Sequence, residues 1–331
     1  MTSISLCMIV FNEELNIERC LKSAYKFVDE IIIVDTGSTD KTKSICKNFG
    51  AKVFDYKWDD DFASARNFGL SKAKCDWILL LDADEELIVY DFKSFKKHLQ
   101  SVSNNVIPVR MVHFYEDNNY DEAYSYISSG LRVLRNKKNL SFRGKIHESL
   151  VLEKIDIYEN VKPNSFVQIS HFGYTKRNLE TKAGRNINML LKEIETNPDG
   201  PWLYYHLGAE YYRLNNFLEA YKLVNMSILK FLDQKIIPPA IAYKLKYDML
   251  ISTKNFETAY HGILKAIELY PDYVDLHFYK GIIQYNYKEY ENAIETFSHC
   301  IMLGENNPKY LILSGVGSFF SLYYLSICYE K

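Results

Sequence analysis

The sequence predicts two domains of different class: an α/β domain with a mostly parallel sheet, followed by an all-α domain built from repeats. In the first 85 residues, short apolar runs alternate with segments of helical period, which is typical of βαβ units. Beyond residue 200, similar positions recur along the chain, as at Ala259 and Ala293, and a fixed period of this kind is typical of helical repeats. A chain of 331 residues is long enough for two ordinary domains.

The composition excludes several classes of protein. With 47% hydrophobic and 25% charged residues the chain is expected to fold, and a net charge of -2 gives no general attraction to nucleic acid. No apolar run reaches the roughly 20 residues that span a bilayer, and the first residues lack the basic leader of a signal peptide. The six cysteines form no CxxC pair and no zinc spacing. We therefore expect a cytoplasmic protein with reduced thiols, no membrane span and no nucleic-acid partner.

Four strands are predicted in the first region, at residues 4–10, 30–35, 53–54 and 77–81. Three helices are predicted between them: one with Asn12 as its N-cap, one that closes near Gly50, and one at 62–73 behind Asp61. The first of these helices has four residues on one apolar face, Ile17, Cys20, Leu21 and Ala24. Acidic or polar clusters follow the strands at their carboxyl ends, where open α/β sheets bind ligands.

The order of elements is harder to predict from residue 88 to 174. A helix is expected at 92–102, with strands near 106–115, 131–134 and 166–170. We expect this region to complete the first domain, at 1–175. A linking helix then occupies much of 176–201, and the repeat domain covers 202–331.

Three segments of the repeat domain align with one another. In each, an aromatic residue is followed three positions later by alanine, at Ala220, Ala259 and Ala293, and Gly208 and Gly281 each lie twelve positions before one of these alanines. The pattern resembles tetratricopeptide repeats, in which small residues permit close packing within a helix pair. The segment 311–330 is expected to start a fourth repeat or to form a capping helix.

Asp82-Ala83-Asp84 follows the last apolar strand of the first region. Breaking a bond from a sugar to a nucleotide diphosphate requires positive charge at the phosphates, because negative charge gathers there as the bond breaks. Carboxylate oxygens suit magnesium or manganese. An Asp-x-Asp pair taken alone can also be a solvated strand end or a helix cap, and the polar clusters after the earlier strands strengthen the functional interpretation.

Four segments carry a family resemblance: Met8-Ile9-Val10-Phe11-Asn12-Glu13-Glu14, Ile31-Ile32-Ile33-Val34-Asp35-Thr36-Gly37-Ser38-Thr39-Asp40-Lys41-Thr42, Ala65-Arg66-Asn67 and Leu79-Leu80-Leu81-Asp82-Ala83-Asp84-Glu85. On these residues the chain resembles the family 2 glycosyltransferases, which have a GT-A fold. Two later segments resemble the branch that includes bacterial core-oligosaccharide glucosyltransferases and glycocin peptide S-glycosyltransferases. They are Phe142-Arg143-Gly144-Lys145-Ile146-His147-Glu148 and His171-Phe172-Gly173-Tyr174.

The resemblance implies a site for the nucleotide of a UDP-sugar. The residues that would hold uracil and ribose are Phe11, Asn12, Glu13 and Asp35, which are otherwise helix caps and turn formers. Two further residues, Arg66 and Asn67, would face the nucleotide or the diphosphate, and the alternative for Arg66 is a charge on a helix surface.

The resemblance also implies a manganese or magnesium ion at the diphosphate. Asp82-Ala83-Asp84 would bind the ion and the UDP-sugar, with Asp84 as the direct metal ligand and Asp82 nearer the ribose. His171 would be a further metal ligand from a later strand, and its alternative is a hydrogen-bonded structural histidine.

An inverting transfer also needs a base that removes the proton of the acceptor. Glu148 is the candidate, with a structural ion pair or a metal contact as its alternative. Many family members use an acidic pair at a helix start, for which the nearest formal match here is Glu116-Asp117. Arg132 and Arg135 are either phosphate or acceptor contacts, or surface charges.

Three functions remain open on these residues. The first is an inverting transfer of glucose or GlcNAc from a UDP-sugar to a polypeptide, on a Ser/Thr hydroxyl as in flagellin or on a Cys thiol, with the repeats docking the acceptor. The second is a glucosyltransferase acting on a cell-envelope oligosaccharide, with the repeats used for self-association into a homo-oligomer or for docking. The third is an inactive sugar-nucleotide-binding scaffold with peptide-binding repeats.

Overall fold

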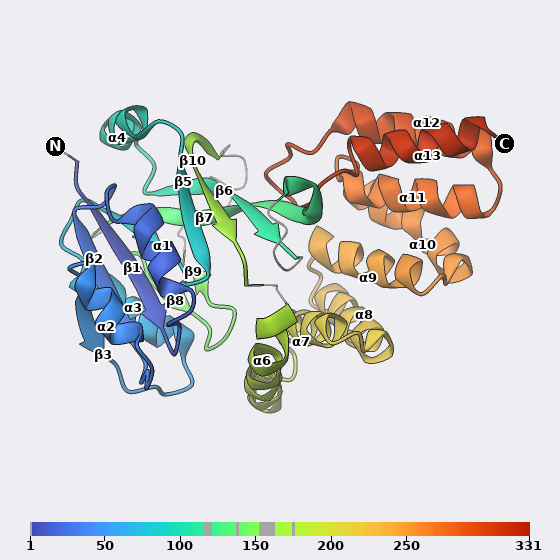
Figure 1. Cartoon of the computed structure of the whole chain (residues 1–331). Helices are drawn as coiled ribbons and strands as arrows, with labels where there is room; N and C mark the ends of the chain where they lie inside the picture. The colour runs from blue at the N-terminus through green and yellow to red at the C-terminus, as the bar shows by residue number, and fades with distance from the viewer. Residues whose placement is uncertain (1, 116–120, 137–138, 152–162, 174–175) are drawn as a thin grey trace. The chain divides into compact units, whose positions relative to one another are not determined.

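A computed structural model describes residues 2–115, 121–136, 139–151, 163–173 and 176–331 of the chain (Figure 1). The chain divides into two compact units. Unit 1 comprises Met1–Tyr115 and Ser128–Tyr174, and unit 2 comprises Glu116–Ile127 and Thr175–Lys331.

Parallel strands form the first half of the sheet in unit 1. The strand β1 (Ile4–Val10) pairs in parallel with both β2 (Glu30–Asp35) and β4 (Trp77–Leu80), and β3 (Lys52–Asp55) pairs in parallel with β2. The runs of Val, Ile and Leu in these strands are buried on both faces, as expected of a parallel sheet between helices. Because the strands run in one direction, their carboxyl ends lie at one edge of the sheet.

The second half of the sheet is mixed. Its strands are β5 (Glu85–Val89), β6 (Val106–Phe114), β7 (Ser125–Arg135) and β10 (Asn164–His171). The complete order is β3-β2-β1-β4-β7-β6-β10-β5, in which β7 is antiparallel to β4, and β10 is parallel to β6 and antiparallel to β5. A separate pair, β8 (Phe142–Arg143) with β9 (Ser149–Leu150), is antiparallel.

Helices cover both faces of this sheet (Figure 1). Side chains of α1 (Ile17–Ala24), α2 (Thr42–Asn48) and α4 (Phe92–Ser101) belong to the larger apolar core, on one face. The C-terminal end of α3 (Phe62–Lys72) packs into a smaller core on the other face, with side chains of β8 and β9. At the start of α3, the side chain of Asp61 accepts a hydrogen bond from the backbone N–H of Ser64 at 2.8 Å.

The predicted strands of the first region and its three helices are confirmed within a few residues, and α1 buries its four predicted apolar residues. The prediction that Asn12 is the N-cap of this helix is wrong, because Asn16 is the N-cap. Asn12 instead adopts a φ of 52°, and its side-chain oxygen accepts a hydrogen bond from the backbone N–H of Thr39 at 2.8 Å. The strand β5 was not predicted, and β7 extends well beyond the predicted 131–134.

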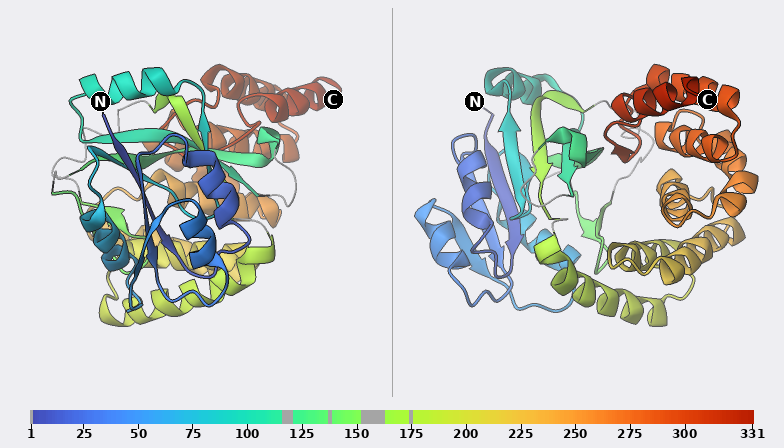
Figure 2. Two further views of the ribbon diagram at one scale, coloured as in Figure 1. Left: turned by 60° about the vertical axis from the view of Figure 1, so that its left-hand side comes forward. Right: turned by 45° about the vertical axis from the view of Figure 1, so that its right-hand side comes forward.

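Unit 2 is a series of helices that pack in sequence order (Figure 2). They are α6 (Lys176–Thr196), α7 (Pro201–Arg213), α8 (Phe217–Asp233), α9 (Ala240–Ser252), α10 (Phe256–Leu269), α11 (Val274–Asn286), α12 (Tyr290–Leu303) and α13 (Phe319–Tyr329). A helix is present where the linking helix was predicted, as α6, and it belongs to unit 2. The helix pairs expected of the repeats are confirmed. No helix in the described part of the chain is both long and apolar enough to cross a membrane. All six cysteines are free thiols.

Unit 2 also contains two short segments that are not repeat helices. The turn η1 (Glu122–Tyr124) leads into β7, whose residues Tyr126 and Ile127 pair antiparallel with β11 (Ile312–Leu313). The ammonium group of Lys244, on α9, lies 4.8 Å from the centre of the Tyr126 ring. Part of the repeat surface is therefore covered by the chain itself.

Glycines allow the close helix pairing that the repeat pattern predicts. A Cβ atom at Gly281 would lie 2.6 Å from the ring of Phe297 on α12, and one at Gly208 would lie 2.8 Å from Val224 on α8. Phe297 is fully buried and has no room to withdraw. The absence of a side chain at these two positions thus sets the approach of α11 to α12 and of α7 to α8.

We predict that Gly281→Ala lowers the free energy of unfolding of unit 2 by about 1–3 kcal/mol, because the added methyl group overpacks the contact with Phe297. Urea denaturation followed by circular dichroism measures this change. Gly184→Ala is the matched control, since Gly184 lies on α6 with nothing within 4 Å of an added Cβ. That change is expected to be neutral or to stabilise by about 0.5–1 kcal/mol. Equal effects of the two substitutions would contradict the packing argument.

A buried ion pair lies inside unit 2. The ammonium group of Lys244 lies 3.4 Å from Oδ1 of Asp275, which also accepts a hydrogen bond from the backbone of Leu313 at 3.1 Å. Oδ2 of Asp275 is buried and has no hydrogen-bond partner in the described part of the chain. Burial raises the pKa of Asp275 to about 6, although Lys244 acts in the opposite direction.

This raised pKa predicts a pH dependence of stability. Between about pH 4 and pH 6 the folded state holds a proton on Asp275 that the unfolded chain releases, so the free energy of unfolding falls as the pH rises through this window. The measurement is urea denaturation at several pH values, for the wild type and for Asp275→Asn. We expect the wild type to show this downward slope and the variant to lack it. Parallel slopes for the two proteins would contradict the prediction.

Candidate functional site

Three acidic side chains lie where β4 leads into β5: Asp82 and Asp84 in the turn, and Glu85 at the start of β5. The backbone N–H of Asp82 donates to Oε2 of Glu85 at 2.8 Å, and the N–H of Glu85 donates to the carbonyl of Asp82 at 3.0 Å. These two bonds close a tight turn at the carboxyl end of β4, with Asp84 inside it. The turn therefore places Asp82, Asp84 and Glu85 at the sheet edge that the sequence indicated.

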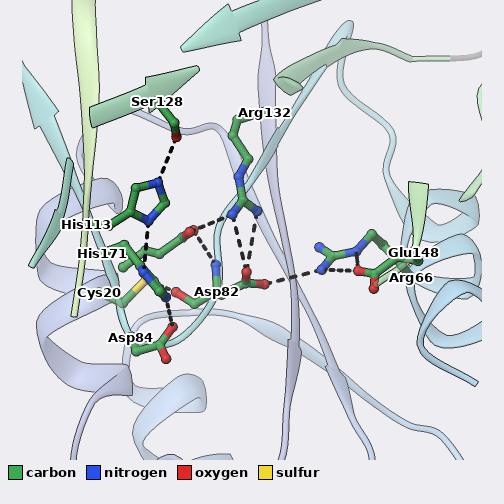
Figure 3. A network of polar contacts seen from close by, with 10 residues as sticks. Cys20, Arg66, Asp82, Asp84, His113, Ser128, Arg132, Glu148 and His171 are labelled. Carbon is green, nitrogen blue, oxygen red and sulfur yellow. Dashed lines mark hydrogen bonds and ion pairs between the residues drawn. The ribbon is translucent and has the colours of Figure 1, made fainter. Parts of the chain in front are cut away.

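Two arginines hold the carboxylate of Asp82 (Figure 3). Arg66 of α3 lies 3.4 Å from its Oδ1, and Arg132 of β7 lies 3.4 Å from its Oδ2. Burial alone would raise the pKa of Asp82, but Arg132 and Arg66 together hold that pKa well below its usual range. Asp82 is therefore ionised, and both of its oxygens face cations of the protein.

Arg132 also binds Glu85, whose side chain is only 1% exposed, with 2.6 Å between Nη2 and Oε1. Burial raises the pKa of Glu85 to about 8, and Arg132 opposes this rise. The two arginines of β7 face different surroundings: Arg135 stacks on the ring of Trp77 and donates to the carbonyl of Val102. Of the two, only Arg132 reaches the acidic cluster.

Arg66 connects this cluster to Glu148. Nε and Nη2 of Arg66 lie 2.8 and 2.7 Å from Oε1 of Glu148. Oε2 of Glu148 accepts no hydrogen bond from the described residues. Nη1 of Arg66 is buried and has no hydrogen-bond partner there either. Its neighbour Asn67 uses its side-chain amide to exchange two hydrogen bonds with the backbone of Phe142, at 2.9 and 2.7 Å.

Asp84 and His171 lie side by side beyond this network. Nε2 of His171, at the end of β10, is 3.7 Å from Oδ1 of Asp84, which is 7% exposed. A Cβ atom at Gly173 would lie 2.5 Å from Nε2 of His171 and 2.6 Å from Oδ2 of Asp84, so the glycine lets the backbone pass close to both. The absence of a side chain at Gly173 thus leaves room for the side chains of Asp84 and His171 beside the backbone.

The Asp84–His171 pair suits a divalent cation that takes further ligands from a substrate. Bonds of about 2.1 Å on each side span at most about 4.2 Å, so one ion can contact both side chains at their present separation of 3.7 Å. Within the described residues, no group of three or more His, Cys, Asp or Glu side chains is placed to hold a metal. Magnesium-like ions commonly use one or two protein ligands and complete their shell with phosphate oxygens and water.

A second histidine, His113, contacts the Nδ1 atom of His171. Nδ1 of His113, on β6, lies 3.2 Å from Nδ1 of His171, and its Nε2 lies 2.8 Å from the hydroxyl oxygen of Ser128. Burial, together with His171 and Arg132, holds the pKa of His113 well below its usual value. No sequence pattern indicated this contact, because His113 and Ser128 belong to no motif.

The carboxyl ends of β1 and β2 carry the other candidate residues. Oδ1 of Asp35 accepts hydrogen bonds from the backbone of Gly37 and Ser38 at 3.1 and 3.0 Å, while its Oδ2 is buried and has no hydrogen-bond partner among the residues that the structure describes. Phe11 is 51% exposed, and Asn12 bonds across to the backbone of the β2–α2 turn. This edge thus has a buried acceptor atom beside an exposed aromatic ring, a combination that suits a planar base with N–H groups.

Glu13 lies next to these residues and takes part in the local turn. Its backbone N–H donates to the hydroxyl of Thr42 at 2.7 Å, and its carboxylate accepts from the amide of Asn16 at 2.8 Å. Ala83 is buried in the β4–β5 turn. Glu116-Asp117 and Tyr174 lie outside the described residues.

The structure brings together Arg66, Asp82, Asp84, Glu148 and His171, as the sequence predicted for a single site. Their individual roles stay predictions. Sequence reasoning did not assign Glu85, which directly follows Asp84. It named Arg132 and Arg135 together, as phosphate or acceptor contacts or as surface charges, and the structure places only Arg132 at the acidic cluster. Only the pairing of β6 with β10 reveals that His113 lies next to His171.

The chain is similar to several known proteins. The model of the family described as Glycosyl transferase family 2 matches residues 5–179. A TPR repeat-containing protein of Synechococcus elongatus is 32% identical over 259 residues, which cover 76% of this chain and 62% of that protein. The SPbeta prophage-derived glycosyltransferase SunS of Bacillus subtilis is 28% identical over 344 residues, which cover 98% of this chain and 76% of SunS. The chain thus spans less than two thirds of the Synechococcus protein.

Among solved structures, TarS of S. aureus (residues 1–349) matches with a TM-score of 0.39 and 14% identity. The match covers 74% of this chain and 86% of the TarS chain.

We predict that Arg132→Met lowers the free energy of unfolding by about 3–5 kcal/mol, because it removes a cation from the ionised carboxylate of Asp82 and the hydrogen-bond donor of the buried Glu85 carboxyl group. Chemical denaturation measures the loss, and Arg135→Met, three positions along the same strand, is the control with a smaller expected cost. In the double variant Arg132→Met/Glu85→Gln the loss should be clearly less than the sum of the two single losses. Additive losses would show that Arg132 and Glu85 do not interact.

Proposed function

Because the chain belongs to glycosyl transferase family 2, we propose that it is a metal-dependent inverting enzyme that transfers a hexose, glucose or GlcNAc, from a UDP-sugar to a polypeptide. The observation that carries this proposal is the arrangement at the carboxyl edge of the sheet. It combines an unpartnered acceptor atom on Asp35, an unpartnered donor atom on Arg66, and the Asp84–His171 pair. A nucleoside diphosphate with a divalent cation has the complementary groups: N–H donors, phosphate oxygens and a metal.

The nucleoside would bind at the ends of β1 and β2. Oδ2 of Asp35 is positioned to accept a hydrogen bond from the base, and Phe11 offers an exposed ring against which the base can pack. A buried carboxylate oxygen without a partner is costly, and a ligand N–H would remove that cost. In this proposal Asn12 and Glu13 shape the same turn.

The diphosphate would bind near Asp84, His171 and Arg66. Asp84 and His171 would hold manganese or magnesium, which when bound neutralises the charge that gathers on the leaving UDP. Nη1 of Arg66 would donate to a phosphate oxygen. Asp82 has both oxygens turned toward arginines, so its part is to orient Arg66 and Arg132 and to face the ribose.

Glu148 is our candidate for the base. Its Oε1 is held by Arg66 while Oε2 remains open to accept the proton of an acceptor hydroxyl or thiol. Arg66 fixes the carboxylate in place. The acceptor oxygen or sulfur would then attack the anomeric carbon on the face opposite UDP, which inverts the configuration at that carbon.

A polypeptide acceptor fits the helical repeats of unit 2, because stacked helix pairs form extended binding surfaces. Part of that surface is already covered by the segment around Tyr126 and β11, so a docked peptide would use the remaining helices.

The direct test is to incubate the protein with UDP-glucose or UDP-GlcNAc, Mn²⁺, and three acceptors: flagellin, a peptide library that contains Ser, Thr and Cys, and a cell-envelope oligosaccharide. Mass spectrometry identifies the modified acceptor, and NMR gives the configuration at the anomeric carbon. We expect a sugar of inverted configuration on polypeptide, and loss of the activity with EDTA. Modification of the oligosaccharide alone would select the second function, and no transfer to any acceptor would contradict the proposal.

We predict that Glu148→Gln lowers kcat by at least about 100-fold with little change in UDP affinity, because the amide can still accept from Arg66 but cannot take a proton. Initial rates of UDP release, with UDP binding by calorimetry, measure the two effects separately. Asp84→Asn is the contrasting variant, and it should weaken the binding of Mn²⁺ itself. A Glu148→Gln enzyme with the kcat of the wild type would show that Glu148 is not the base.

A further inference from the structure

His113 and His171 face each other because of the strand register. They are register partners in the parallel pair β6–β10, so their side chains leave the sheet on the same face at neighbouring positions. Their rings are steeply inclined, at 77°, and the two Nδ1 atoms lie 3.2 Å apart. Ser128, on β7 next to β6, lies at the far side of His113, with its hydroxyl 2.8 Å from Nε2. The three side chains thus form a row that ends at Asp84 (Figure 3).

The two facing nitrogens restrict where the protons can be. In a hydrogen bond between two imidazole nitrogens, one carries the proton and the other accepts it. If Nδ1 of His171 donates, its Nε2 is unprotonated and offers a lone pair beside Asp84. Nδ1 of His113 then accepts, the proton of His113 is on Nε2, and this N–H donates to the hydroxyl oxygen of Ser128. In the reverse arrangement Nε2 of His171 carries a proton directed at Asp84, and it cannot bind a cation.

From this geometry we propose that His113 is a positioning residue, which accepts a hydrogen bond from Nδ1 of His171 and so holds His171 in the tautomer that presents Nε2 to a divalent cation beside Asp84. Ser128 completes the row by accepting from Nε2 of His113. The inference rests on the proposed metal site. It assigns to His113 the part that a carboxylate or a backbone carbonyl plays behind many metal-binding histidines.

The surroundings of His171 support a fixed ring orientation. The missing side chain at Gly173 allows the backbone to lie against the Nε2 edge of the ring, while His113 contacts the Nδ1 edge. Backbone pairing of His171 with both Glu85 on β5 and His113 on β6 fixes the base of the side chain. A ring held on both edges loses little conformational entropy when it binds an ion.

The first measurement is the affinity for Mn²⁺ in the presence of UDP, by electron paramagnetic resonance of free Mn²⁺. His113→Phe keeps a ring of similar size and removes the acceptor, and we expect it to weaken Mn²⁺ binding by about 10–100-fold. His113→Asn places an amide oxygen near the position of Nδ1, so it should restore most of the affinity. Equal affinities of His113→Phe and the wild type would overturn the proposal, and so would equal losses in both variants.

The second measurement does not depend on a variant that folds. In ¹⁵N-histidine-labelled wild type with Mg²⁺ and UDP, the nitrogen chemical shifts report the tautomer of each ring. We expect His171 protonated at Nδ1 and His113 protonated at Nε2. A proton on Nε2 of His171 in this complex would overturn the proposal.

The proposed function and the proposed role of His113 can be refuted separately. A wild type with these tautomers and with Mn²⁺ affinity sensitive to His113, but with no transfer from any UDP-sugar, would refute the proposed function and leave the part of His113 intact. A wild type that transfers the sugar, with tautomers opposite to those expected, would refute only the part of His113.

Discussion

The pairing of three neighbouring acidic side chains with two arginines is the constraint on which the candidate site of unit 1 depends. Asp82, Glu85 and Glu148 converge on Arg66 and Arg132, at separations between 2.6 and 3.4 Å. Carboxylates this close together repel one another in a protein interior unless cations stand between them. Because Arg66 comes from α3 and Arg132 from β7, their ion pairs tie both elements to the turn after β4.

This network divides the acidic residues into two groups that contact different partners. Asp82 and Glu85 are engaged with arginines of the protein, whereas the carboxylate of Asp84 points away from them toward His171. Asp82 and Asp84, two positions apart, therefore do not hold one common ligand together. Asp84 is the member suited to a cation, and Asp82 is the member that holds the arginines around it. The turn between β4 and β5 separates them by directing their side chains to opposite sides.

In unit 2, local packing carries the stability, and one buried ion pair joins the repeat helices to β11. Gly208 and Gly281 allow close contact within helix pairs, which nearest-neighbour packing in a repeat protein requires. The pair of Lys244 with Asp275 lies where the repeat helices meet the segments around Tyr126 and Leu313. The backbone N–H of Leu313 donates to Oδ1 of Asp275, and this hydrogen bond connects the ion pair to β11.

The sequence by itself determined the fold class, the linking helix, the repeat helices and the edge of the sheet at which the site lies. These features follow from periodicity, from glycine and alanine spacing, and from polar residues after apolar strands, all of which are local. Tertiary structure alone decided which oxygen of Asp35 is left unpartnered, that Arg132 and not Arg135 reaches the cluster, and that His113 stands behind His171. Each of these depends on the pairing of strands far apart in the chain, and the register of that pairing leaves no local pattern in the sequence.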